Sequence, residues 1–163
     1  VKNLYIENIR FTGKENLIKS TMSKVAINDC SFSTYTTAIN LTAGSLLLTN
    51  SSFKGYKVEE GSYYMYKGVA IVAENSSYVK LLNNYLKGMS TGFMGNYIIK
   101  VESNRNVFEN VVTGEYYLNI FDLSIIDNEY YQNYEAITLS GNTNAQISNN
   151  EFYKTTKWDI CLS

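Results

Sequence analysis

Several residue types that carry common protein chemistry are absent or scarce in this chain. Its 163 residues include no histidine, no proline and two cysteines, and only 18% of them are charged. The absence of histidine excludes histidine-based catalytic triads and histidine zinc ligands. Average usage would supply about eight prolines. Because proline cannot donate a hydrogen bond to a β ladder, its absence suits a chain built mostly from central strands.

Charge and hydropathy exclude two classes of partner. The 14 Lys and Arg residues nearly balance the 15 Asp and Glu residues, which leaves a net charge of −1. A chain without excess positive charge lacks the main attraction to a phosphate backbone, so we expect no nucleic-acid partner. The longest uninterrupted apolar runs, residues 46–48 and 69–73, are far too short to span a bilayer, so we expect no membrane insertion.

The residues that are abundant favour strands and tight turns. Hydrophobic residues make up 45% of the chain, which is enough to bury a core. Asparagine occurs 20 times and tyrosine 15 times. Tyrosine is enriched in strands, whereas asparagine suits turns and left-handed backbone.

A short pattern recurs seven times along the chain. It reads apolar, x, apolar, x, Asn or Asp, x, x, aromatic, and its first copy runs from Leu4 to Phe11. Its final positions are 11, 32, 53, 86, 108, 131 and 152, so the spacing is nearly constant except for one long interval between positions 53 and 86. A nearly fixed period of this length is the signature of a repeat architecture.

A second, alternating pattern falls between the copies of the first. It occupies residues 17–19, 38–41, 70–73, 98–100, 118–120, 136–139 and 159–162. Alternation with a period of two predicts short strands, so each unit of about 22 residues holds three of them. The sequence therefore predicts an all-β fold, a right-handed parallel β-helix of about seven rungs that forms one domain over residues 1–163. Cys30 and Cys161 would lie on the order of 24 Å apart in such a stack, too far for a disulfide.

The repeat resembles the pectin-lyase-like β-helix superfamily over essentially the whole chain. The resemblance is carried by the turn residues, which are similar to that superfamily's asparagine ladder. They are Asn8, Asn50, Asn83, Asn128 and Asn149, with Asp29 and Arg105 as departures. The fold hosts lyases, hydrolases, phage adhesins and binding proteins, so it does not define the activity. Because Val1 and Ser163 adjoin open strand edges, we expect a fragment of a longer protein with further flanking segments or caps.

Aromatic residues supply the candidate binding site. The long interval between positions 53 and 86 contains an inserted loop, residues 54–68, which carries four tyrosines, and the resemblance implies that this connection walls a ligand groove. Aromatic residues also recur just before the alternating strands, where stacked rungs would align them in a column. Rings with apolar faces and polar rims suit pyranose sugars. The predicted ligand-binding residues are Tyr35, Tyr56, Tyr63, Tyr64, Tyr66, Tyr97, Tyr117, Tyr134 and Trp158. The alternative is that these rings pack on neighbouring rungs or in a small core of the loop.

Three acidic residues are the best candidates for catalysis. Glu74, Glu102 and Asp122 each follow an alternating strand, and adjacent rungs would place carboxylates about 5 Å apart, as in retaining glycosidases or a calcium cluster. The alternative, solvated acids in turns, is the one we favour, because Asp122 is out of register by one residue. We therefore expect no catalytic residue, no metal site and no cofactor.

These expectations favour a polysaccharide-binding protein that is not an enzyme. The composition and aromatic face resemble the C-terminal β-helix of the tāpirins, cellulose-binding surface proteins of thermophilic biomass-degrading bacteria. The resemblance implies an extracellular location, insoluble cellulose as the partner, and attachment of cells to plant biomass. Two alternatives stay open. One is a phage, viral or bacterial adhesin segment that trimerises through a hydrophobic flank, and the other is a fragment of a polysaccharide lyase or hydrolase.

Overall fold

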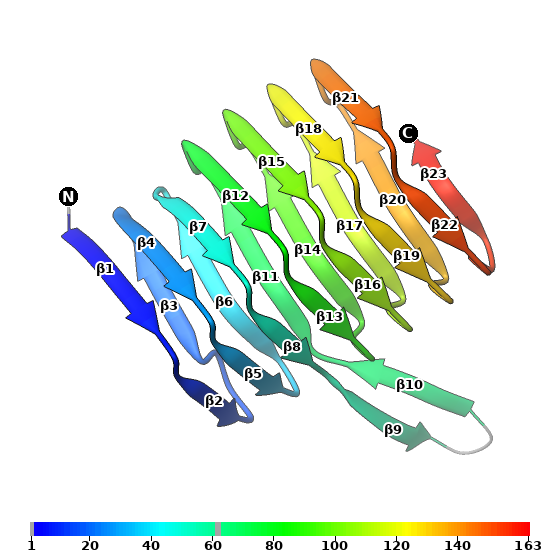
Figure 1. The fold of residues 1–163 in the computed structure, drawn as a ribbon, viewed down its shortest axis with the longest axis horizontal. Coiled ribbons are helices and arrows are strands. Elements are labelled where there is room, and N and C mark those ends of the chain that lie inside the picture. Colours follow the sequence, from blue (N-terminus) through cyan, green and yellow to red (C-terminus); the bar gives the residue numbers. More distant parts are fainter. Residues whose placement is uncertain (1, 61–62) are drawn as a thin grey trace.

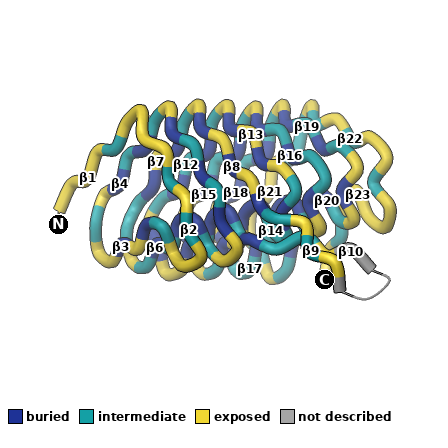
Figure 2. The backbone as a smooth tube through the Cα atoms, turned by 90° about the horizontal axis from the view of Figure 1, so that it is seen from below, coloured by how far each residue is buried: buried dark blue, intermediate teal, exposed yellow. Residues whose placement is uncertain are grey.

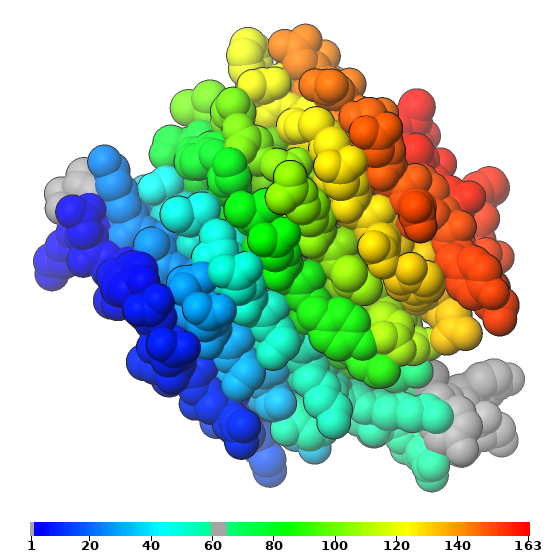
Figure 3. Space-filling model, viewed as in Figure 1, coloured from blue at the N-terminus to red at the C-terminus, as the bar shows by residue number. Residues whose placement is uncertain are grey.

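The computed structural model shows 23 β-strands among the residues that it describes (Figure 1). It describes residues 2–60 and 63–163, with the side chains of residues 60, 63 and 64 excepted. Within these ranges there is no helix, and hence none of the length and hydropathy that crossing a membrane would need. Three parallel sheets of seven strands and one antiparallel hairpin account for all the strands. Figure 3 shows the successive rungs side by side as bands in chain order.

Each sheet takes one strand from every rung. Sheet A consists of β1 (Lys2–Glu7), β4 (Ser23–Asn28), β7 (Ser45–Thr49), β12 (Tyr78–Leu82), β15 (Lys100–Asn104), β18 (Asp122–Ile126) and β21 (Asn144–Ser148). Sheet B consists of β2 (Arg10–Gly13), β5 (Ser31–Thr34), β8 (Ser52–Lys54), β13 (Tyr85–Lys87), β16 (Val107–Glu109), β19 (Glu129–Tyr131) and β22 (Glu151–Tyr153). Sheet C consists of β3 (Ile18–Thr21), β6 (Thr37–Thr42), β11 (Val69–Glu74), β14 (Thr91–Asn96), β17 (Thr113–Leu118), β20 (Glu135–Ser140) and β23 (Trp158–Leu162). The chain is therefore a parallel β-solenoid of about seven turns with three strands per turn, as the period predicted.

Buried residues recur on successive rungs (Figure 2), and those in register form columns in the interior. In sheet B the rings of Phe11, Phe32 and Phe53 stack nearly parallel, with centroids 4.9 and 4.6 Å apart. Leu86 continues this column, and Phe108, Tyr130 and Phe152 form a second stack with centroids 5.1 and 5.0 Å apart. The inward residue on the sixth rung is thus Tyr130 and not Tyr131, which faces outward. With this correction the inward positions 86, 108, 130 and 152 are evenly spaced.

Two strands of sheet C lie earlier in the chain than the alternating pattern predicted. The predicted segments 98–100 and 118–120 mostly follow β14 and β17, and the true strands place Gly92 and Gly114 in the column that holds Ala38, Ala70 and Ala136. A Cβ atom on Gly92 would lie 2.7 Å from the Phe108 ring. Small residues fill this column because aromatic rings of sheet B lie against it. For this reason neither strand shows the apolar pattern of the other rungs.

Left-handed residues make the corners between sheets. The corner between sheets A and B has φ of 50–57° at seven consecutive rungs, at Asn8, Asp29, Asn50, Asn83, Arg105, Asp127 and Asn149. Asparagine and aspartate tolerate this conformation better than other residues that bear a Cβ atom. The sixth turn residue is Asp127, so the prediction of Asn128 at this position is corrected.

The buried asparagine ladder lies one residue after these turn residues. It consists of the buried Asn84, Asn106 and Asn128 and the half-buried Asn150, with Cys30 and Ser51 at the same position in earlier rungs. The backbone N–H of Asn84 donates to Oδ1 of Asn106 at 2.9 Å, and Nδ2 of Asn84 donates to the Leu48 carbonyl at 3.1 Å. The ladder therefore ties each rung to both of its neighbours. Cys30 is buried, Cys161 is half-buried, and both thiols are free.

A hairpin projects from the corner between sheets B and C (Figure 1). Its strands are β9 (Tyr56–Glu60) and β10 (Tyr63–Lys67), which lie between β8 and β11 inside the predicted insertion 54–68. Gly55 and Gly68 stand where the hairpin leaves and rejoins the solenoid, and the Cα atom of Gly55 lies 3.3 Å from a Cβ built on Gly68.

Candidate functional site

The outer face of sheet A carries a row of apolar side chains on its first three strands. Tyr5 on β1, Ala26 on β4 and Leu47 on β7 are in register, so they lie side by side at strand spacings of about 4.8 Å. Tyr5 is 64% exposed and Leu47 is 42% exposed. Large apolar side chains that gather on one exposed face indicate a binding surface.

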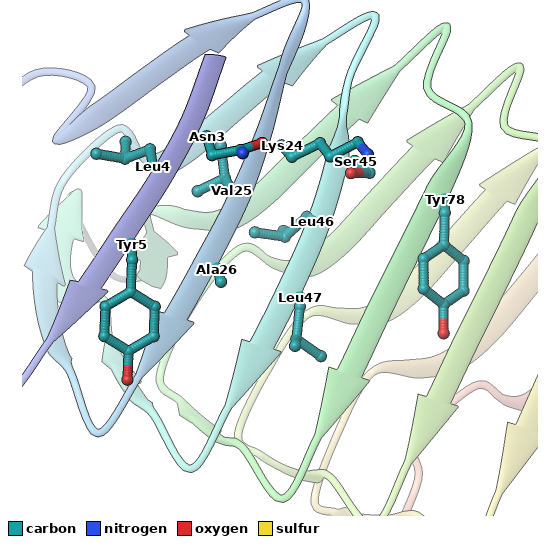
Figure 4. Close-up of a pocket in the computed structure, with 10 residues that line it drawn as sticks. All are labelled: Asn3, Leu4, Tyr5, Lys24, Val25, Ala26, Ser45, Leu46, Leu47 and Tyr78. Atoms are coloured by element: carbon teal, nitrogen blue, oxygen red, sulfur yellow. The ribbon is translucent and has the colours of Figure 1, made fainter. Parts of the chain in front are cut away.

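This row forms part of a groove that ends at a second tyrosine, Tyr78 on β12 (Figure 4). The groove has a volume of about 320 Å³, within the range of small-ligand sites. The small side chain of Ala26 leaves a hollow between Tyr5 and Leu47. The strands that carry Tyr5 and Tyr78 are three spacings apart, so the groove is about 14 Å long across the sheet.

Polar groups line one edge of the groove. Asn3, Lys24 and Ser45 occupy the next register row, which continues to Tyr78. They bring an amide, an ammonium and a hydroxyl to the rim. An apolar floor with a tyrosine at each end and a rim of hydrogen-bonding groups matches the chemistry of a sugar ring, which has apolar C–H faces and a polar periphery.

Glu102 holds the second tyrosine in place. The Tyr78 hydroxyl donates to Glu102 Oε2 at 3.0 Å, while Lys100 Nζ lies 2.9 Å from Oε1 and Lys80 Nζ lies 3.0 Å from Oε2. The hydrogen bond from Lys100, together with those from Lys80 and Tyr78, outweighs burial and lowers the pKa of Glu102 to about 2. Burial and the bond to Glu102 raise the pKa of Tyr78 to about 12. At neutral pH, Tyr78 is a neutral, anchored ring and Glu102 has no proton to donate.

Three of the predicted aromatic residues come together at the hairpin. Tyr35 and Tyr56 stack with ring centroids 3.6 Å apart and an angle of 5° between their planes. Tyr35 stays 40% exposed, and Tyr66 on β10 is half-buried. Stacking covers one face of each ring in the pair, so only their opposite faces are available to a ligand.

Tyr134 and Trp158 lie further along the same corner and remain exposed, at 46% and 49%. Lys157 Nζ lies 5.3 Å from the centroid of the Tyr134 ring. The rungs between this pair and the hairpin carry Ser90 and Val112 at the corner. The column of rings expected from the sequence is therefore interrupted.

The remaining predicted aromatic residues lie elsewhere. Tyr97 is 60% exposed, but it occupies the corner between sheets C and A, with φ of 51°. Tyr117 is buried in the core, where its hydroxyl donates to Glu115 at 2.8 Å, so its expected place on the binding face is corrected. The alternation of β17 turns residue 117 inward and Tyr116 outward. The side chains of Tyr63 and Tyr64 lie outside the described residues.

The three candidate acids do not form a cluster. Glu74 ends β11 in sheet C and pairs with Asn96, whereas Glu102 and Asp122 lie in sheet A and pair with Ser124 and Lys100. The expected row of three carboxylates depended on the misplaced strands of sheet C. Over residues 2–60 and 63–163, no three side chains among His, Cys, Asp and Glu are grouped so that they could hold a metal ion.

We did not predict the groove residues from the sequence, because they stand at positions of the recurring pattern that accept any residue. Tyr5, Ala26 and Leu47 each stand between the two apolar positions of the recurring pattern. In the following two rungs the same position holds Lys80 and Glu102. Apolar residues at an outward position in three successive repeats were a signal that could have revealed the groove.

Comparisons with known proteins do not assign this chain to a family. No protein-family model matches it, and neither a curated protein nor a solved structure shows significant similarity.

Proposed function

We propose that this protein is a non-catalytic carbohydrate-binding solenoid that holds a neutral polysaccharide, cellulose, in the sheet A groove. The observation that carries the proposal is the groove itself, with tyrosines at both ends, an apolar floor and a polar rim. The proposal moves the binding face away from the corner between sheets B and C, where the rings are interrupted. The alternative binding site is the exposed pair Tyr134 and Trp158 at that corner.

The absence of catalysis is part of the proposal. Glu102 contacts the groove at Tyr78, and its carboxylate is engaged by Lys80, Lys100 and Tyr78. A general acid needs a proton near neutral pH, and a carboxyl with a pKa of about 2 keeps none. The separation of Glu74 from Glu102 and Asp122 also supports a binding role.

The family and the source that we propose for this protein rest on resemblance. A parallel solenoid of about seven turns, an asparagine ladder and exposed tyrosines support a place among the pectin-lyase-like right-handed β-helices. Within that superfamily we propose a relation to the C-terminal domain of the tāpirins. The protein would then act at the surface of a thermophilic bacterium and attach the cell to plant biomass.

Depletion onto microcrystalline cellulose, with xylan and pectin as comparisons, tests the function. We expect binding that survives high salt, because ring stacking on a neutral polymer involves no ion pairs. Tyr5→Ala should weaken binding about tenfold, or ~1.4 kcal/mol. Trp158→Ala and Tyr153→Ala should leave it unchanged, since neither residue lines the groove.

Two other results would contradict binding in the sheet A groove. Loss with Trp158→Ala but not with Tyr5→Ala would move the site to the corner between sheets B and C. No depletion on any of the three polymers would overturn the function.

A second candidate function is self-association as an adhesin segment. It is favoured by the corner between sheets C and A, where Tyr97, Ile99 and Phe121 are 60%, 62% and 59% exposed. Trimerisation through a hydrophobic patch would cover these side chains. A trimer in sedimentation velocity that dissociates with Phe121→Ser, in a protein that binds no polysaccharide, would favour this function over the first.

A further inference from the structure

Sheet B carries a separate cavity on its outer face, near the end of the solenoid that contains β22. It has a volume of about 340 Å³ and is lined by Val107, Glu109, Tyr131, Gln132 and Tyr153. Tyr131 and Tyr153 are in register on β19 and β22. The cavity lies on a different sheet from the proposed polysaccharide groove.

The two tyrosines form a V-shaped pair. Their ring centroids are 6.0 Å apart, and their planes are inclined by 58°. Tyr131 is half-buried, and its hydroxyl donates to Glu129 Oε2 at 2.8 Å, which fixes the ring. Tyr153 is 54% exposed. A cation on the open side of the V can lie within about 6 Å of both centroids, the range of a cation–π contact.

A positive charge already lies near one of these rings. Lys154 Nζ lies 5.1 Å from the centroid of Tyr153. Two carboxylates lie beside the pair, because Glu109 lines the cavity and Glu129 accepts from the Tyr131 hydroxyl. The rings and the acidic surroundings together favour a cationic ligand over a neutral or anionic one.

Hydrogen bonding decides which kind of cation fits. Glu109 already accepts from Lys87 Nζ at 2.7 Å, from Asn110 Nδ2 at 3.3 Å and from the Tyr85 hydroxyl. Glu129 accepts from Tyr131. A primary ammonium is strongly hydrated and needs acceptors to replace its water, whereas a quaternary ammonium donates no hydrogen bond and needs only rings and a negative field.

We propose that this cavity on sheet B is a binding site for a quaternary ammonium group, such as the trimethylammonium head of choline. The rings of Tyr131 and Tyr153 provide the contact surface, and the carboxylates of Glu109 and Glu129 provide the field. This site is independent of polysaccharide binding and adds a second ligand class.

Titration of the isotope-labelled protein with choline chloride, followed by amide chemical shifts in NMR, tests the proposal. We expect saturable shifts confined to β16, β19 and β22. The neutral carbon isostere 3,3-dimethylbutan-1-ol and the primary amine n-butylammonium should each bind at least tenfold more weakly. Equal binding of either compound would overturn the proposal, because selection for a quaternary cation would be absent.

Matched variants locate the site. Tyr153→Leu should weaken choline binding at least tenfold, while Tyr153→Phe keeps the ring and should keep the affinity. Because Tyr153 is exposed, both variants should keep the circular dichroism spectrum of the parent. Tyr5→Ala should leave choline binding unchanged, which separates this test from that of the polysaccharide groove. Undiminished binding by Tyr153→Leu would overturn the proposal.

Discussion

Neighbouring asparagines in this chain have different structural roles. Asn83 is exposed with φ of 55°, and it turns the chain from sheet A to sheet B. Asn84 is buried, and its side chain bonds to the rungs on both sides. It accepts from the Ser51 N–H and donates to the Leu48 carbonyl on the preceding rung, and it donates to Oδ1 of Asn106 on the following rung. The first role needs a residue that tolerates left-handed backbone, and the second needs a buried side-chain amide.

The two roles predict opposite sensitivities to substitution. Asn84→Ala leaves buried backbone groups without partners and should lower the free energy of unfolding by about 3 kcal/mol. Asn83→Gly keeps the left-handed turn and should change it by less than about 0.5 kcal/mol. Urea denaturation of both variants makes the comparison. Similar losses for the two would contradict the ladder's assignment to Asn84.

A carboxyl group stands in the core where other rungs have apolar side chains. Glu115 is fully buried between Phe93 and Ile137 in its column. Hydroxyls from all three sheets point at it, from Ser103, Tyr117 and Tyr130. Burial raises the pKa of Glu115, against the opposing effect of these hydrogen bonds.

This residue should make stability depend on pH. Because its pKa is higher in the folded protein than in the unfolded chain, the folded state keeps the proton over a wider range. The free energy of unfolding should therefore fall as pH rises above the unfolded value of 4.5, until the folded group also ionises. Glu115→Gln should remove this part of the decline. Thermal melts of both proteins between about pH 5 and pH 8 measure it, with Glu74→Gln at an exposed position as the control. Parallel profiles for the parent and Glu115→Gln would rule the effect out.

At the scale of elements, the hairpin is an addition to a regular rung. On the preceding rung, Tyr35 and Thr36 join β5 to β6. Without residues 56–67, Gly55 and Gly68 would join β8 to β11 in the same way, and the long interval of the repeat would become as short as the two before it. The positions of these two glycines support such a short turn.

Removal of the hairpin should therefore leave the solenoid intact. We expect a deletion of residues 56–67 to fold and to shift Tm by no more than about 4 °C. The loss of Tyr56 exposes one face of Tyr35, which should cost little because the pair lies at the surface. Cellulose binding should persist if the ligand occupies sheet A. A collapse of Tm would show that the hairpin is part of the core.

At the scale of the whole molecule, stability comes from contacts between neighbouring rungs. The inward column of sheet B changes from phenylalanine to leucine at Leu86, which lies between the two aromatic stacks. In a solenoid each rung contacts only the rungs beside it, so a defect in the middle weakens the connection between two halves.

A cavity at this position should affect both halves. Leu86→Ala should lower the free energy of unfolding by about 3 kcal/mol. Hydrogen exchange should speed up at β8 and β16, which flank β13, more than at β2 or β22. A uniform change along the chain would contradict stabilisation by neighbouring rungs.

The sequence by itself determined the class of fold and the number of rungs. Its nearly constant period and its alternating strands leave few other ways to bury Ile27, Leu48 or Phe53, because each rung can cover its apolar face only with another rung. The left-handed corner between sheets A and B was also readable from the recurring pattern, to within one residue.

Only the tertiary structure decided which residues face outward together. A shift of one residue turns a side chain from solvent to core, as it did for Tyr117 and Tyr131, and periodicity alone does not specify that shift where a strand departs from its consensus. Two strands of sheet C were not recognised in the sequence for a different reason. Glycine stands there in the column of small residues, because an aromatic ring such as that of Phe108 lies against it. The groove beside Tyr5 depends on residues far apart in the chain, Tyr5 and Tyr78, which become neighbours of one surface only when the rungs stack.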